Sequence, residues 1–210
     1  MSRSEIIKKS VLAGVLIAIG ALFSVVASPY GPVVQGLCFS VGLFAVLCTC
    51  SRLFTGSMLG IESVWRKEIT ISDVAVMWAT LWAMNLVGAV CVALMASQTG
   101  FDATAMAQSK AALPWHSVLM RAVLCNVLVC LAAWTFNHGE RTTVSALAAS
   151  VLPVACFVAC GFEHSVADML YMPLGMMQGA VSLTDCIRVI LTATAGNMVG
   201  GIGFAWMVRE

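Results

Sequence analysis

The sequence predicts an all-α membrane protein with six transmembrane helices, arranged as two inverted three-helix repeats in which the second and fifth helices are broken. The class follows from composition: 60% of the 210 residues are hydrophobic and 10% are charged, whereas a soluble domain carries about 25% charged residues. The mean hydropathy is +0.96. The repeats follow from short motifs that recur in the two halves of the chain. We expect one transmembrane channel domain over residues 1–210.

Six apolar segments approach or reach the roughly 20 residues needed to cross a bilayer. They cover about 10–28, 32–51, 74–97, 115–136, 144–160 and 185–208. The first follows a basic N-terminus, but it is longer than the roughly 7–15 apolar residues of a signal peptide, so we interpret it as a retained span. Shorter apolar pieces at about 57–65 and 166–174 cannot span alone. Each is expected to complete the broken helix before it.

Lysine and arginine are distributed unequally between the predicted loops. With the N-terminus inside, the cytoplasmic side holds seven of them: Arg3, Lys8, Lys9, Arg66, Lys67, Arg141 and Arg209. The outer loops hold only Lys110, and the other three lie within or at the ends of spans. Cytoplasmic loops are enriched in these residues. We therefore expect an inner-membrane protein with both termini cytoplasmic and the loop at 98–113 outside.

The two halves of the chain share motifs at matching places. The second span is interrupted by "SRLFTGS" (51–57) and the fifth by "CGFEHS" (160–165), while the third carries "MNLVGA" (84–89) and the sixth "GNMVGG" (196–201). Three spans separate the copies, so repeat 1 (about 10–97) and repeat 2 (about 115–208) have opposite topology. Inverted repeats whose broken helices meet near the bilayer midplane are typical of transport proteins.

The breaks carry the candidate polar residues. His164 is the only histidine predicted to lie deep in the membrane, where an ionisable group indicates function; the alternative is a neutral imidazole bonded to a backbone carbonyl. Thr55 in the other break either donates to an anion or caps the short helix that follows. Glu163 is expected to point elsewhere, in a structural role. Asn126 lies inside a span, where hydrogen bonding between helices is the usual role.

Five pieces of sequence carry a resemblance to a known family. They are "LFTG" (53–56), "NLVG" (85–88), "LCNVLVCLAAW" (124–134), "LPVACFVACGFEHSVADM" (152–169) and "GNMVGG" (196–201). With these residues the chain resembles the formate/nitrite transporter family of bacterial small-anion channels, over nearly its whole length. The resemblance implies an aquaporin-like protomer of six helices, assembled as a homopentamer with one pore in each protomer.

The resemblance also implies roles for individual residues. His164 corresponds to the central pore histidine and Thr55 to its partner threonine, Lys110 to a lysine that draws anions toward the pore, and Asn126 to a pore-side asparagine. Two apolar constrictions are implied, an outer one formed by Phe39, Leu43 and Phe157 and an inner one formed by Leu53, Phe54 and Val129. One departure is Arg52, which stands where the family usually has an acidic residue.

These residues suggest a mechanism. A bare anion would pass two apolar constrictions only at high cost, whereas a neutral weak acid crosses far more easily. His164 would either hand the anion a proton or stabilise it by hydrogen bonding, and both versions stay open. The run "ADMLYMPLG" (167–175) looks more like formate-type than nitrite-type members of the family, and this resemblance favours formate, with nitrite or hydrosulfide as alternatives.

Other classes of function are less well supported by the sequence. We expect no enzyme, and neither a metal nor another cofactor, because the nine cysteines lie mostly in apolar runs, where cysteine packs as a small hydrophobe. A membrane redox or metal-binding subunit would need paired histidines on facing helices or a cytoplasmic catalytic domain, and the chain has neither. A purely structural scaffold would leave the two breaks unexplained. The expected partners are the small anion, the lipid bilayer and further copies of the chain, and no basic patch suggests nucleic acid.

Overall fold

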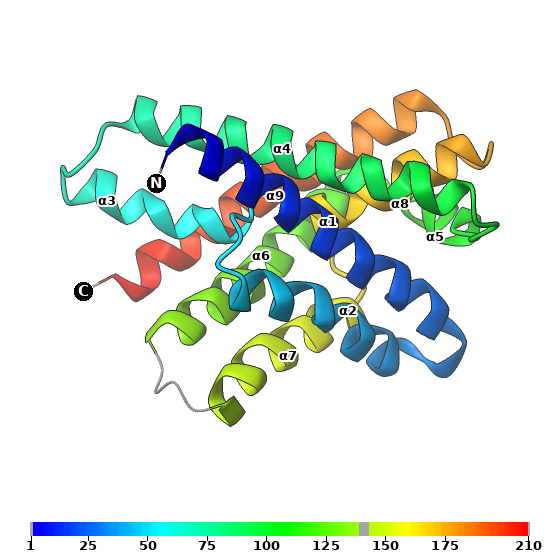
Figure 1. The fold of residues 1–210 in the computed structure, drawn as a ribbon, viewed down its shortest axis with the longest axis horizontal. Coiled ribbons are helices and arrows are strands. Elements are labelled where there is room, and N and C mark those ends of the chain that lie inside the picture. Colours follow the sequence, from blue (N-terminus) through cyan, green and yellow to red (C-terminus); the bar gives the residue numbers. More distant parts are fainter. Residues whose placement is uncertain (1, 139–142, 210) are drawn as a thin grey trace.

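The computed structural model of the chain describes residues 2–138 and 143–209, and over these residues its regular elements are all helices (Figure 1). In chain order they are α1 (Arg3–Ala27), the 3-10 helix η1 (Ser28–Tyr30), α2 (Pro32–Cys48), the 3-10 helix η2 (Gly56–Gly60), α3 (Ile61–Trp65), α4 (Ile71–Ser97), α5 (Thr104–Ala111), α6 (Trp115–His138), α7 (Thr143–Ala159), α8 (Ser165–Met177) and α9 (Leu183–Val208). Arg141, which the sequence predicts on the cytoplasmic side, lies outside the described residues.

Each predicted apolar segment forms a helix. Four stretches, namely α1 with η1, α4, α6 and α9, are long and apolar enough to cross a membrane. The helices α2 and α7 are shorter, and α2 is followed by η2 and α3 as α7 is by α8. Two differences from the prediction have a clear cause. The helix α1 begins before the apolar run because Ser2 caps it by accepting from Glu5 N at 3.2 Å, and α5 forms in the predicted outer loop, where its polar composition escapes a hydropathy search.

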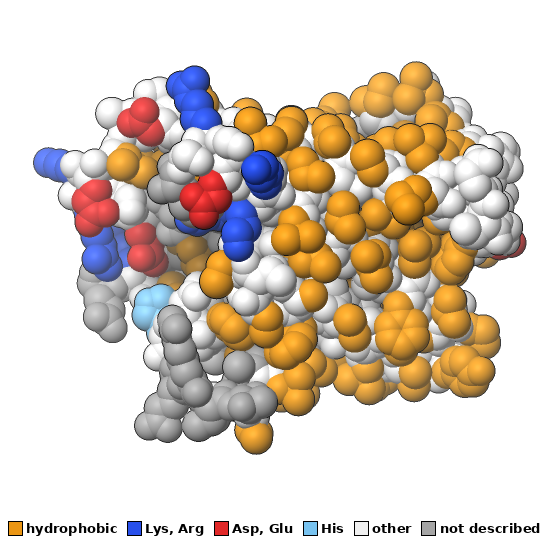
Figure 2. Space-filling view, in the orientation of Figure 1, with side chains coloured by type: hydrophobic (Ala, Val, Ile, Leu, Met, Phe, Trp, Pro, Cys, Tyr) orange, Lys and Arg blue, Asp and Glu red, His pale blue; other side chains and the backbone are white. Residues whose placement is uncertain are grey.

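The helices pack in two similar groups. Helix α1 packs against α2 and α4, helix α6 packs against α7 and α9, and α8 lies against both α4 and α9. Both termini lie at the same end of the molecule, beside α3, and α5 lies at the other end (Figure 1). Charged side chains gather at the end with the termini, while hydrophobic side chains cover most of the rest of the face in Figure 2. An apolar surface this large fits hydrocarbon better than water.

The helices before the two breaks end in the same way. Cys50 N donates to Leu47 O and Ser51 N to Val46 O at the end of α2. At the end of α7, the corresponding bonds run from Gly161 N to Val158 O and from Phe162 N to Phe157 O. This pattern is the Schellman motif, which requires a residue with positive φ. Gly161 (φ 66) adopts this conformation freely because glycine has no Cβ. Cys50 (φ 49) adopts it although it has a side chain, which is uncommon.

An asparagine of each Asn-x-Val-Gly motif holds one break together. The side chain of Asn85 on α4 accepts from Phe54 N at 2.8 Å and donates to Arg52 O at 3.0 Å and to Ser10 O of α1 at 2.7 Å. At this break the buried amide therefore pairs with backbone groups that have no partner within a helix, as apolar surroundings require.

The second asparagine makes the same three bonds in the other half. Asn197 on α9 accepts from Ser165 N at 2.9 Å and donates to Glu163 O at 3.0 Å and to Ala122 O of α6 at 2.8 Å. The glycine of each motif allows close packing: a Cβ at Gly88 would lie 2.2 Å from a carbonyl oxygen of α1, and one at Gly200 would lie 2.1 Å from a carbonyl oxygen of α6. The recurrence noticed in the sequence thus corresponds to one arrangement built twice.

Candidate functional site

The two breaks bring a histidine and a threonine into contact in the middle of the molecule. His164 Nε2 lies 2.9 Å from Thr55 Oγ1, although 109 positions separate the residues. Both are buried, with exposed fractions of 3% for His164 and 0% for Thr55. The two polar residues that the sequence singled out therefore form one buried pair.

The hydrogen bonds fix the protonation pattern of the imidazole. His164 occupies the N-cap of α8, and its Nδ1 lies 3.2 Å from Ala167 N. Because a backbone N–H can only donate, Nδ1 is an acceptor and the ring is neutral, with its proton on Nε2. The Nε2–H then donates to Thr55 Oγ1. Thr55 stands at the N-cap of η2, but its side chain makes no capping bond there, so its hydroxyl serves the histidine instead.

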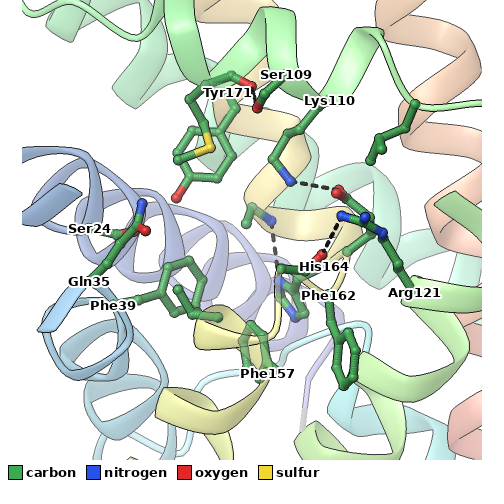
Figure 3. A pocket seen from close by; sticks show the side chains of 16 residues that line it. Ser24, Gln35, Phe39, Ser109, Lys110, Arg121, Phe157, Phe162, His164 and Tyr171 are labelled. Atoms are coloured by element: carbon green, nitrogen blue, oxygen red, sulfur yellow. Dashed lines mark hydrogen bonds and ion pairs between the residues drawn. The ribbon is translucent and has the colours of Figure 1, made fainter. Parts of the chain in front are cut away.

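A cavity of about 330 Å³ reaches His164 from the end of the molecule that carries α5 (Figure 3), and it is named the outer cavity after the constriction predicted beside it. Phe39 and Phe157 lie on its wall beside the histidine. Their ring centroids are 5.6 Å apart, edge to face, and the Phe157 ring stacks on the imidazole with centroids 5.8 Å apart and planes 23° apart. Two residues predicted for the outer constriction therefore lie against the histidine.

A second cavity of about 150 Å³ lies at the first break, on the side of the last residues of α6. Leu53 and Val129 line it, as does Leu43. The structure thus places Leu43, predicted for the outer constriction, beside two residues predicted for the inner one. Phe54 is buried at 2% exposure and is not on the wall of this cavity.

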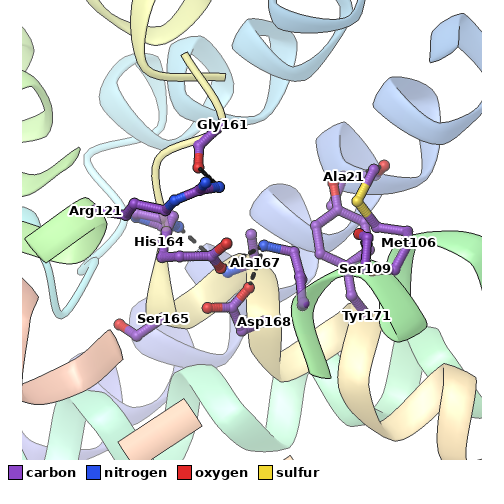
Figure 4. A network of polar contacts seen from close by, with 12 residues as sticks. Ala21, Met106, Ser109, Arg121, Gly161, His164, Ser165, Ala167, Asp168 and Tyr171 are labelled. Atoms are coloured by element: carbon purple, nitrogen blue, oxygen red, sulfur yellow. Dashed lines mark hydrogen bonds and ion pairs between the residues drawn. The ribbon is translucent and has the colours of Figure 1, made fainter. Parts of the chain in front are cut away.

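Lys110 belongs to a buried charge cluster with Glu163 and Asp168, of which Asp168 is labelled in Figure 4. Its Nζ lies 2.6 Å from Glu163 Oε2 and 2.8 Å from Asp168 Oδ1. The contact with Asp168 is an ion pair that lies outside hydrogen-bond geometry, and neither oxygen of this carboxylate has a hydrogen-bond partner among the described residues. Buried charges need such pairing to be tolerated. Glu163 thus points into the protein toward Lys110.

Asp168 is a residue of the site that the sequence reasoning missed. It is 0% exposed and lies one helical turn after His164, on α8. The signal was available, since a carboxylate in the apolar piece at 166–174 is as unexpected as a histidine in a span.

Asn126 lies near the pair, but its amide braces backbone. Its Nδ2 donates to Thr55 O at 3.2 Å and to Asn197 O at 2.7 Å, which ties the first break to α9. Asn126 lines neither the outer nor the second cavity. Over residues 2–138 and 143–209, no three His, Cys, Asp or Glu side chains come together in a way that could hold a metal ion.

The chain is similar to known proteins in sequence and in fold. The sequence pattern of the family described as "Formate/nitrite transporter" matches residues 1–209. A probable formate transporter of Methanothermobacter thermautotrophicus is 34% identical, over 95% of this chain and 85% of its own. Two solved structures are similar: an FNT family ion channel (TM-score 0.92, 26% identity, covering 100% of this chain and 92% of its own) and a pentameric formate channel with formate bound (TM-score 0.84, 28% identity, 99% and 97%). The chain is thus a multi-pass membrane protein. It belongs to the formate/nitrite transporter family, whose members are channels and transporters and not enzymes.

Proposed function

We propose that this protein is a transmembrane channel for small monovalent anions of weak acids, with formate as its substrate. One observation carries the proposal: the buried pair of His164 and Thr55 lies between two cavities, each with an apolar wall next to the pair. One polar site between two apolar constrictions suits a small solute that loses its hydration shell as it passes either constriction. Formate is favoured because a similar solved channel has formate bound, and nitrite and hydrosulfide are the alternatives.

We further propose that residues 1–210 form one aquaporin-like protomer of six transmembrane helices in two inverted repeats. The matched bonds of Asn85 and Asn197 and the matched ends of α2 and α7 support this. In this proposal, α2 with η2 and α3, and α7 with α8, are the broken second and fifth spans. The pentameric state of a similar channel supports assembly as a homopentamer.

The proposed constrictions border the polar pair. Phe39 and Phe157 form the outer one against the imidazole, while Leu53, Phe54 and Val129, joined by Leu43, form the inner one. Between them, the Nε2–H of His164 and the hydroxyl of Thr55 offer an anion two hydrogen-bond donors without a net charge. An anion oxygen would take the Nε2–H from Thr55, so the cost of dehydration is partly offset by directed bonds.

The geometry bears on how a proton would reach the anion. A neutral imidazole that gave up its only N–H proton would become an imidazolate, so hand-over from Nε2 requires a second proton on Nδ1 first. That proton would replace the bond from Ala167 N–H and place a positive ring at the N-terminus of α8, where the helix dipole is unfavourable for cations. Stabilisation by hydrogen bonding needs neither step, and we propose it as the main role of His164.

The test compares three variants in proteoliposomes, with swelling followed in formate, nitrite, hydrosulfide and chloride. His164→Phe is expected to abolish formate passage with assembly intact. His164→Asn keeps hydrogen bonding but cannot titrate, so it should lose rate and keep the parental pH profile; loss of the pH dependence would support proton hand-over instead. Thr55→Val is the matched comparison, because it keeps the imidazole and removes the threonine hydroxyl, which is both the other donor and the acceptor of the His164 Nε2–H. Parental formate passage in a folded His164→Phe variant would show that the histidine is structural and refute the proposal.

The proposed orientation has both termini on the cytoplasmic side of the inner membrane. It rests on the positions of the lysines and arginines and on the charged side chains at the end with the termini (Figure 2). In a cysteine-free background, cysteines introduced in the loop at 98–113 should react with an impermeant reagent added outside the cell. Reaction only from the inside would overturn the orientation.

A further inference from the structure

Arg121 of α6 is a second basic residue on the wall of the outer cavity (Figure 3). It is half-buried. Its NH1 donates to Gly161 O at 3.1 Å (Figure 4), and the backbone carbonyl of Arg121 accepts from Glu163 N at 3.4 Å. The first bond holds the guanidinium at the break that carries His164, and the second joins the backbone of α6 to the same break.

The two cations of this cavity differ in their partners. Lys110 has a carboxylate oxygen at 2.6 Å and another at 2.8 Å, so its charge is offset by two acidic side chains. Arg121 makes no ion pair with any Asp or Glu that the structure describes. Arg121 is therefore the cation on this wall whose charge no described carboxylate offsets by direct contact.

A purely structural role for Arg121 has a precedent in the other half of the molecule. Lys9 of α1 stands at the corresponding place, because its carbonyl accepts from Arg52 N and its Nζ donates to Thr49 O at the end of α2. Lysine and arginine side chains often donate hydrogen bonds to the free carbonyls at the C-terminal ends of helices. Two features set Arg121 apart. It lines the outer cavity, whereas Lys9 lines neither the outer nor the second cavity. The guanidinium of Arg121 also has several further N–H donors beyond the one bound to Gly161.

We propose that Arg121 is an anion-docking residue of the outer cavity, which draws a small planar anion from solution to the entrance beside Phe157. The inference rests on the proposed function, since it names the group that concentrates the anion before it reaches His164. A guanidinium can bind two oxygens of one anion at once. Docking here therefore favours formate or nitrite, each with two oxygens, over hydrosulfide.

The experiment measures initial uptake of radiolabelled formate by cells that express the protein, at increasing external concentrations of a salt with an impermeant organic anion. Uptake by the parent should fall as salt screens the cavity. Arg121→Gln removes the charge and keeps an amide donor for Gly161 O, so uptake at low salt should fall about fivefold, the effect of one unit charge about 4 Å away in water. Its remaining uptake should hardly depend on salt.

Two further variants complete the design. Arg121→Lys keeps the positive charge but cannot bind two oxygens of one anion with paired N–H groups. The salt dependence should therefore remain, while the ratio of formate to hydrosulfide passage falls. Arg188→Gln is the matched control: Arg188 also donates to backbone carbonyls, at Leu113 and Ala111, but lies off the cavity wall. It should keep the parental salt dependence.

The outcomes separate this inference from the proposed function. If the parent takes up no formate, the proposed function fails first. If the parent takes up formate, two results would refute the docking role and leave the proposed function standing. One is that Arg121→Gln keeps the salt dependence of the parent. The other is that Arg188→Gln loses the salt dependence as fully as Arg121→Gln. Should Arg121→Gln not reach the membrane, Arg121→Lys decides, because a Lys variant with no salt dependence would also refute it.

Discussion

Replacing the asparagine that braces the second break offers a quantitative test of how this fold is held together. In Asn197→Ala, three side-chain hydrogen bonds are lost, to Ser165 N, Glu163 O and Ala122 O. The carbonyl of Ala122 lies inside α6, so it can keep a helical partner. The groups left without a described partner are therefore Ser165 N–H and Glu163 O, which flank His164 on its two sides.

The size of the effect depends on the reference state. In a water-soluble protein, two buried unsatisfied groups would cost about 2–6 kcal/mol together. Within a membrane the unfolded helices also find partners, and single interhelical hydrogen bonds are worth about 0.6 kcal/mol on average and about 1.7 kcal/mol at most. Three bonds then give about 2–5 kcal/mol, and we expect the lower half of this range because the outer cavity can admit water to the break.

The assay is unfolding of the reconstituted protein by a denaturing detergent, followed by circular dichroism, together with formate passage in proteoliposomes. Asn85→Ala is the matched variant, because its bonds to Arg52 O and Phe54 N brace the other break, which contains Thr55. Both variants should lose similar stability, but Asn197→Ala should lose more formate passage because it releases His164. A stability loss below about 0.5 kcal/mol in Asn197→Ala, or equal loss of passage in both variants, would refute this reasoning.

Three further predictions use the same measurements. Gly200→Ala should lower the free energy of unfolding by about 1–3 kcal/mol or more, because its Cβ would lie 2.1 Å from a backbone carbonyl of α6. Gly203→Ala, with open space around its Cβ, should be neutral or slightly stabilising. Equal effects of the two substitutions would contradict the packing argument. Lys110→Met should lower the free energy of unfolding by about 3–5 kcal/mol, because it leaves two buried carboxylates without a cation. Adding Asp168→Asn should restore part of that free energy. If the double variant is no more stable, Asp168 is not part of the charge balance. Phe157→Ala should widen the outer cavity beside His164 and increase passage of larger or hydrated solutes in swelling assays. Unchanged selectivity would argue against its place in the constriction.

Much of the protein was decided by its sequence. A chain with so few charges cannot form a soluble domain, so composition alone determined the membrane class. The breaks were visible because glycine, serine and charged residues interrupt apolar runs, and the structure has its helix ends within a few residues of the predicted places. Asn-x-Val-Gly could be noticed as a repeat, since both copies must meet the same local need for a bracing amide and a close helix contact.

Tertiary structure alone decided which residues meet. The contact of His164 with Thr55 joins positions 109 apart, and neither hydropathy nor local propensity encodes the relative placement of two breaks. The same holds for the charge cluster, in which Lys110 from an unpredicted short helix meets Asp168 of α8. Leu43 illustrates the limit most clearly. The residue lies one helical turn after Phe39 on α2, yet it lines the second cavity while Phe39 lines the outer one, because a single turn rises about 5.4 Å, which is enough to pass from one side of the polar pair to the other.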